Sequence, residues 1–188
     1  MWYDYRTRYG GPGRSLDLIF RPLLGWATAW SFDRLRLWAE HDIHPELVRT
    51  CTLIYSVTRL TMIFVWCWHG AIPKLLFPQV DEVAMLRASG LGPASLPWIG
   101  AGEILFGLVG VVFWRWRPYL LLTSAAMVLA LAGVAWRSPG YVDAAFNPVA
   151  LNVSAVALGL CGWWAAPYTA FAGRCRRRPQ GRGVETAT

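Results

Sequence analysis

Residues 97–114 read PWIGAGEILFGLVGVVFW, and residues 119–136 read YLLLTSAAMVLALAGVAW. An α-helix needs roughly 20 residues, at about 1.5 Å each, to cross about 30 Å of hydrocarbon, and both stretches approach that length. Neither has the broad polar face that a helix of a water-soluble bundle needs. We therefore expect two membrane-spanning helices, joined by a short turn that contains Arg115 and Arg117.

Two further stretches have the same character, residues 51–69 (CTLIYSVTRLTMIFVWCWH) and residues 148–168. Pro97, Pro118 and Pro148 open the three later stretches. Proline is tolerated in a first helical turn because its missing N–H would have no partner there. The prediction is an all-α protein, a four-helix transmembrane bundle with short loops on the periplasmic side.

The composition agrees with a membrane protein and excludes several other classes. Hydrophobic residues make up 55% of the 188 residues and charged residues 15%, against about 25% charged in an ordinary soluble domain. These values exclude a disordered chain, a disulfide-rich secreted domain and a typical cytosolic enzyme. The net charge of +7 comes with so little total charge that we expect no nucleic-acid partner.

Basic residues are divided unevenly between the two sides of the predicted bundle. Lys74, Arg87 and Arg137 are the three on one side, against ten on the other. The positive-inside rule places the side with ten in the cytoplasm, and with it both termini. We expect a multi-pass protein of the bacterial inner membrane. The ten residues are Arg34, Arg36, Arg49, Arg115, Arg117, Arg174, Arg176, Arg177, Arg178 and Arg182.

The two ends of the chain differ from the spans. Residues 1–49 are predicted to form a cytoplasmic or interfacial segment, residues 50–172 the four-span domain and residues 173–188 a basic cytoplasmic tail. Between about residues 15 and 38, aromatic and aliphatic residues alternate with arginine and aspartate, which is typical of an amphipathic helix in the membrane interface. A cytoplasmic helix that docks on a partner protein is the alternative. We expect the tail to contact anionic lipid headgroups.

Polar side chains inside the spans are informative because charges within a membrane are rare unless they are paired or functional. Arg59 lies near the middle of the first predicted span, Glu103 in the second and Asn152 in the fourth. Small residues follow Glu103 and Asn152 at helical spacing, so we expect both faces to point inward. Glu103 and Asn152 should then meet in the outer half of the bundle. By helical rise, Arg59 is expected about 7 Å deeper than Glu103.

Two interpretations of these residues remain open. In the first, an Arg59–Glu103 salt bridge fixes the register of the helices. In the second, a polar cavity holds a quinone headgroup or relays protons, with Glu103 as proton acceptor and Arg59 or His69 polarising a quinone carbonyl. Further side chains that could contact the headgroup are Trp66, Lys74, Asn147 and Asn152.

The sequence gives little support for a metal site, a phosphate-binding loop or a catalytic nucleophile. The four cysteines form no C-x-x-C pair, and His41 and His44 have no further clustered ligand, so we expect no metal site. Phosphate-binding glycine loops and nucleophile motifs are absent from the sequence.

Residues 59–77, RLTMIFVWCWHGAIPKLLF, combine an arginine, a tryptophan, a glycine and a Pro-Lys pair. With this stretch, the chain between about residues 57 and 168 resembles the DoxX-like family of small four-helix membrane proteins. The resemblance implies an association with membrane redox complexes, since the family name comes from the small subunit of a thiosulfate:quinone oxidoreductase. The other shared motifs are Asp81-Glu82, Gly102-Glu103 with Gly107, and Phe146-Asn147-Pro148 with Asn152.

The favoured functional hypothesis is an accessory subunit, non-catalytic by itself, that associates with other membrane-protein subunits of a redox or electron-transfer assembly. The alternative is a quinone-linked oxidoreductase subunit with its headgroup site in the outer half of the bundle. No cofactor follows from the residues themselves, and a quinone is the one candidate.

Overall fold

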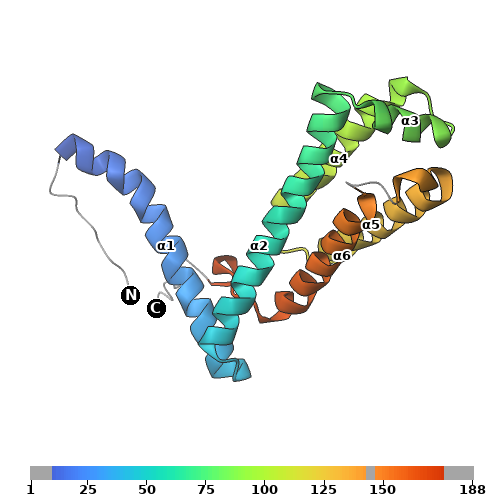
Figure 1. Cartoon of the computed structure of the whole chain (residues 1–188). Coiled ribbons are helices and arrows are strands. Elements are labelled where there is room, and N and C mark those ends of the chain that lie inside the picture. Colours follow the sequence, from blue (N-terminus) through green and yellow to red (C-terminus); the bar gives the residue numbers. More distant parts are fainter. Residues whose placement is uncertain (1–9, 143–146, 176–188) are drawn as a thin grey trace, which may run out of the picture. The chain divides into compact units, whose positions relative to one another are not determined.

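The computed structural model describes residues 10–142 and 147–175, with side chains from residue 16 onward. Every regular element among these residues is helical (Figure 1). Several features that the sequence singled out lie outside the described residues. These are residues 1–9 of the N-terminal segment, Phe146 of the fourth-span motif, and residues 176–188 of the basic tail.

Four of the described helices are long and apolar enough to cross a membrane, which confirms the predicted number of spans. α2 (Pro45–Gly70) continues through a π-helix, Ala71–Leu76, so the first span is longer than the sequence suggested. A 3-10 turn precedes α4 and another follows α6. The other three helices are α4 (Leu96–Val112), α5 (Pro118–Arg137) and α6 (Pro148–Ala165).

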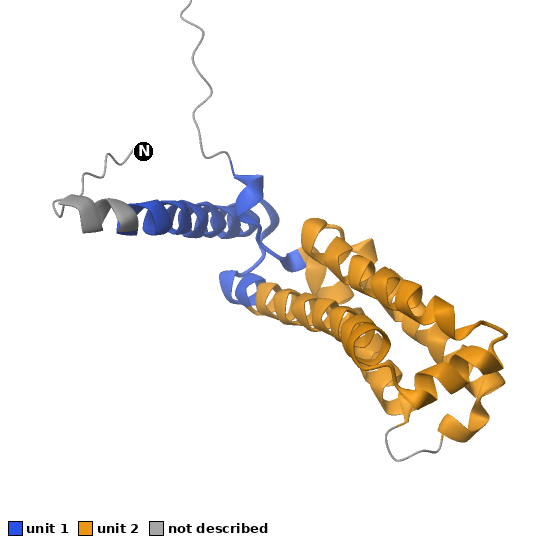
Figure 2. Cartoon of the chain, turned by 90° about the horizontal axis from the view of Figure 1, so that it is seen from above, with its two compact units in different colours: residues 1–49, 168–188 blue, residues 50–167 orange. Residues whose placement is uncertain are grey.

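The chain divides into two compact units (Figure 2). Unit 1 comprises Met1–Arg49 and Tyr168–Thr188, and unit 2 comprises Thr50–Pro167. Segments from opposite ends of the chain thus fold together in unit 1, while unit 2 contains most of the spanning residues.

In unit 1, α1 (Gly10–His41) is followed by a tight connection to α2, in which Asp42 has a positive φ of 53°. The 3-10 helix Ala172–Arg174 packs on α1. A small apolar core joins α1, the connection, the first turn of α2 and the C-terminal segment. Its members are Leu37, Val48 and Ala170, with Trp30 and Ile43 packed against them.

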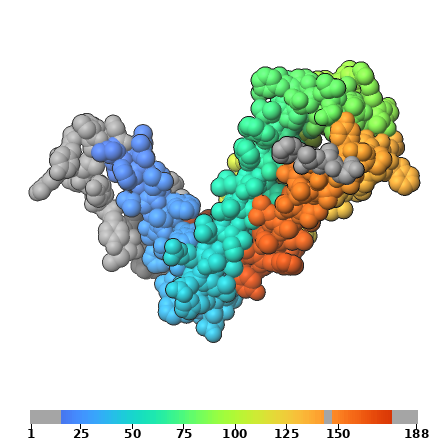
Figure 3. Space-filling view, in the orientation of Figure 1, coloured from blue at the N-terminus to red at the C-terminus, as the bar shows by residue number. Residues whose placement is uncertain are grey.

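In unit 2, glycines allow helix pairs to approach closely. The backbones of α2 and α4 meet at Gly70 and Gly100. α6 packs on α5 at Gly159, beside Ser124, and on α2 at Gly162, beside Thr58. Figure 3 shows α2 and α6 in direct contact over this stretch. The small-residue faces predicted on the second and fourth spans are therefore buried, but they serve different helix pairs.

Sequence reasoning missed α3 (Val80–Ala88), which lies between the first two spans at one end of unit 2 (Figure 1). Two contacts hold it to the end of α5 and the turn that follows. Tyr141 donates a hydrogen bond to the Asp81 carboxylate at 3.1 Å, and Arg137 donates to the carbonyl of Ala88 at 3.4 Å. The bond to Asp81 raises the pKa of Tyr141 above its ordinary value, because the protonated phenol is the donor.

Replacing Gly100 by alanine should destabilise unit 2. The new Cβ would lie 2.7 Å from the Gly70 carbonyl oxygen and 2.9 Å from the Lys74 Cβ, and such overpacking costs about 1–3 kcal/mol. Thermal unfolding of the detergent-purified variant should show a lower Tm than wild type. Gly102→Ala, where nothing lies within 4 Å, is the matched control. Equal Tm values for the two variants would contradict the close α2–α4 contact.

Candidate functional site

Lys74 is the buried cation at the α3 end of unit 2. The π-helix Ala71–Leu76 carries it, and the residue is 7% exposed. Its Nζ lies 3.1 Å from Glu103 Oε2 and 3.5 Å from Glu82 Oε2, and it donates to the His69 carbonyl at 3.4 Å. We call Lys74, Glu82 and Glu103 the Lys74 cluster.

The Lys74 cluster joins three elements through one ammonium group. Lys74 extends from the end of the first span, Glu82 lies on α3 and Glu103 on α4. Glu103 is 19% exposed and Glu82 26%, so water screens these pairs only in part. A buried charge is costly unless it is paired and hydrogen-bonded. The two carboxylates and the carbonyl provide that compensation.

Arg59, fully buried, is the second internal cation of unit 2. Its Nε donates to the Gly110 carbonyl at 3.1 Å, its NH1 group to the Trp116 carbonyl at 3.0 Å, and its NH2 group to the Phe113 carbonyl. These oxygens belong to the last turn of α4 and the turn that follows it, where backbone carbonyls have no partner within the helix. A cation at a helix C-terminus also interacts favourably with the helix dipole. Arg59 thus caps α4.

Aromatic rings surround the Arg59 guanidinium. Its central carbon lies 4.6 Å from the Tyr119 ring centroid, 5.8 Å from that of Tyr55 and 5.9 Å from that of Trp114. NH1 also donates to the Tyr55 hydroxyl at 3.1 Å, and that hydroxyl donates to the Trp114 carbonyl. Cation–π contacts of this kind are worth more when they are removed from water. Sequence reasoning missed this ring cage, because its members come from α2, from α5 and from the turn that joins α4 to α5.

Of the two interpretations left open for these residues, the Arg59–Glu103 salt bridge is wrong, and the packing of α2 against α4 explains why. Gly70 lies opposite Gly100, and Cys67 lies against Gly107, so the two helices run antiparallel with Arg59 near the C-terminus of α4. Arg59 is eleven residues before Gly70, or about 16 Å along the helix. Glu103 therefore pairs with Lys74 instead.

The remaining predicted site residues lie in different settings. Trp66 packs edge-on against Phe106, with the two ring centroids 4.8 Å apart. Its indole N–H is buried and has no hydrogen-bond partner among the described residues. Asn147 caps α6 by accepting from the Ala150 N–H at 3.0 Å. Asn152 is buried on α6. No hydrogen bond or ion pair in the described part of the chain links it to Glu103.

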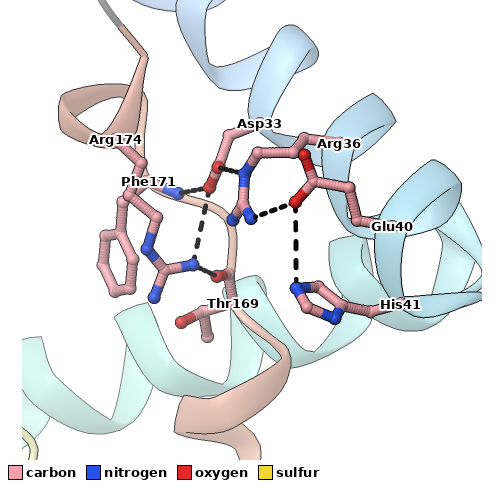
Figure 4. Close-up of polar contacts among 7 residues, drawn as sticks. All are labelled: Asp33, Arg36, Glu40, His41, Thr169, Phe171 and Arg174. Atoms are coloured by element: carbon pink, nitrogen blue, oxygen red, sulfur yellow. Dashed lines mark hydrogen bonds and ion pairs between the residues drawn. The ribbon is translucent and has the colours of Figure 1, made fainter.

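Unit 1 contains a polar network that sequence reasoning also missed (Figure 4). Asp33, fully buried, accepts from Arg36 Nε at 3.0 Å and from the Phe171 N–H at 2.8 Å. Arg174 lies 3.5 Å from the same carboxylate and donates to the Thr169 carbonyl at 2.9 Å. Hydrogen bonds to Asp33, and then to Glu40, raise the pKa of Arg36 above its ordinary value. The network fastens the C-terminal segment to α1.

Apolar spanning helices held together by buried cations define this chain as an all-α integral membrane protein. It belongs to the DoxX-like family, whose sequence profile matches residues 63–160. The resemblance at the first span is thereby confirmed.

One curated relative is the uncharacterized membrane protein YndG of Bacillus subtilis (strain 168). It is 51% identical over 137 residues, which cover 69% of this chain and 51% of the relative. The chain thus spans about half the length of that protein. No solved structure matches the chain.

Removing the Lys74 ammonium should leave two carboxylates without a counterion. We expect Lys74→Met to cost about 3 kcal/mol, the lower end for a broken buried pair, because Glu82 is partly exposed. The double variant Lys74→Met/Glu103→Gln should recover part of the lost Tm, since the most buried carboxylate is then neutral. Thermal unfolding followed by tryptophan fluorescence measures both effects. Strictly additive Tm changes would contradict the direct pair.

Proposed function

We propose that this DoxX-like integral membrane protein is an accessory subunit, non-catalytic by itself, of a larger redox or electron-transfer assembly in the membrane. It would lie in the bacterial inner membrane with both termini in the cytoplasm. Ten arginines are predicted on the side of the membrane that carries the termini, against three basic residues on the other side. This difference supports the orientation.

The proposal rests on one observation, namely that the buried cations contact oxygen atoms of the protein itself. Among the described residues of unit 2, Arg59 and Lys74 are the buried basic side chains. Each guanidinium nitrogen of Arg59 donates to a protein oxygen, and the Lys74 ammonium lies between two carboxylates. A catalytic cation needs donors directed at the place where charge develops on the substrate. These donors are directed at the protein, as a scaffold requires.

Family membership and length support the same proposal. The resemblance to DoxX-type proteins implies that the chain associates with membrane redox complexes. The curated relative has about as much sequence outside the match as within it, which is compatible with a helical module that works beside further protein.

Extraction of the affinity-tagged full chain from its native membrane in a mild detergent tests the proposal. We expect subunits of a membrane oxidoreductase to co-purify in near-equimolar amounts, as quantified by mass spectrometry. An unrelated four-span protein with the same tag, expressed at the same level, is the control. If the chain elutes alone from membranes that contain its native partners, the accessory role is wrong.

A quinone-linked role is the second candidate, and the buried indole N–H of Trp66 without a partner favours it. A quinone carbonyl could accept from that group, and Lys74, Asn147 or Asn152 could contribute further contacts. Glu103 would be the proton acceptor in this alternative. His69 would polarise a quinone carbonyl, since the Arg59 nitrogens already donate to protein oxygens. Glu103→Gln separates the two roles. It should leave the electron-transfer rate of the purified assembly unchanged if the chain is accessory, and abolish quinone-coupled turnover if it carries the quinone.

A further inference from the structure

We propose that the N-terminal half of α1 lies in the surface of an anionic bilayer, with one apolar strip inserted among the lipids. The strip consists of Leu16, Ile19, Phe20, Leu23 and Trp26, each more than half exposed. This inference does not depend on the proposed accessory role.

The strip follows from helical geometry. Its members are separated by one, three or four residues, so at 100° per residue they share an arc of about 120° on one side of α1. Asp17, Arg21 and Gly25 lie on the other side, which also carries one strongly exposed apolar residue, Leu18. Such an arrangement suits a helix parallel to the membrane, whose apolar face enters the boundary between headgroups and acyl chains.

α1 is too polar to be another span and too apolar to rest in water. It has 32 residues but is not among the four described helices that are apolar enough to cross a membrane. Within unit 1, the contacts of α1 involve residues nearer its C-terminus, such as Asp33 and Leu37. None of the described residues of unit 1 covers the strip, since each of its members is more than half exposed. A contiguous exposed apolar surface of this kind marks a membrane or protein contact.

Chain connectivity favours lipid as the occupant. α1 ends at His41 and α2, a candidate span, begins at Pro45. The three intervening residues can extend over about 10 Å at most. The end of α1 is therefore tethered close to a helix that enters the bilayer, whichever other proteins are present.

Charge favours an anionic lipid surface in particular. The sequence of unit 1 contains twelve arginines and seven acidic residues, so it carries +5 of the chain's net charge of +7. Basic residues near an anionic membrane surface are attracted to its headgroups. The Asp33 network also fastens Arg174, the first arginine of the basic tail, to α1.

Site-directed spin labelling of the full chain in nanodiscs tests the proposal. In a variant without native cysteines, a nitroxide is attached at Leu23→Cys on the strip or at Gly25→Cys on the opposite side. In nanodiscs of phosphatidylcholine with phosphatidylglycerol, the label at 23 should be more accessible to oxygen than to a water-soluble nickel complex. The label at 25 should show the reverse preference.

Several results would overturn the proposal. Preference for the nickel complex at both positions would mean that the strip lies in water. Low accessibility to both reagents at position 23 would mean that protein covers it, from a partner or a second copy. An unchanged preference at 23 in pure phosphatidylcholine would refute the role of anionic headgroups.

A second measurement applies if the cysteine-free chain does not fold. Hydrogen exchange of residues 16–28 in the natural chain should be slower in anionic than in neutral nanodiscs. Leu23→Gln should remove that difference, and Thr28→Gln, outside the strip, should preserve it. Equal exchange of the natural chain in both lipids would also overturn the proposal.

Discussion

The guanidinium of Arg59 closes the C-terminal end of α4, and the rest of unit 2 is arranged around that contact. Three carbonyl oxygens from the end of α4 and the following turn receive its hydrogen bonds. In hydrocarbon no water could satisfy them. Because α2 supplies this cap, the end of α4 and the start of α5 are fixed relative to the first span. Arg117 repeats the device by donating to the Trp163 carbonyl near the end of α6.

The Lys74 cluster holds the other end of the same helix pair. Arg59 and Lys74 both come from the first span, and they contact α4 near its opposite ends. Between them, Gly70, Gly100 and Gly107 bring the two backbones close together. The cations and the glycines are mutually dependent, since the Lys74 ammonium reaches Glu103 only when the helices touch. This explains why a short bundle contains charged groups that are costly to bury.

The sequence predicts the spans and their small-residue faces because both depend on local patterns. Apolar length identifies the helices, and the spacing of Gly100, Gly107 and Gly110 identifies the packed face of α4. The partner of Arg59 could not be predicted, because backbone carbonyls leave no mark in a sequence and the register of two helices is a tertiary property. The resemblance had drawn attention to Asp81-Glu82, yet nothing in the sequence connected Glu82 with Lys74.

The contacts of the buried charged groups bear on function, because they decide whether unit 2 has one polar centre or two. An Arg59–Glu103 pair would have formed one polar centre suited to a headgroup. The structure divides it into a cap at one end of α4 and an ion cluster at the other. Both hold helices of unit 2 together.

The most direct test of this account is a double-mutant cycle between Arg59→Ala and Glu103→Gln, with Tm measured on detergent-purified protein. Arg59→Ala should be strongly destabilising, by more than about 3 kcal/mol, because it leaves three buried carbonyls without a donor. Arg59→Lys should recover only part of that loss. The effects of Arg59→Ala and Glu103→Gln should add, since distant sites without shared partners are independent. A substantial coupling between them, or an Arg59→Ala variant as stable as wild type, would contradict the account.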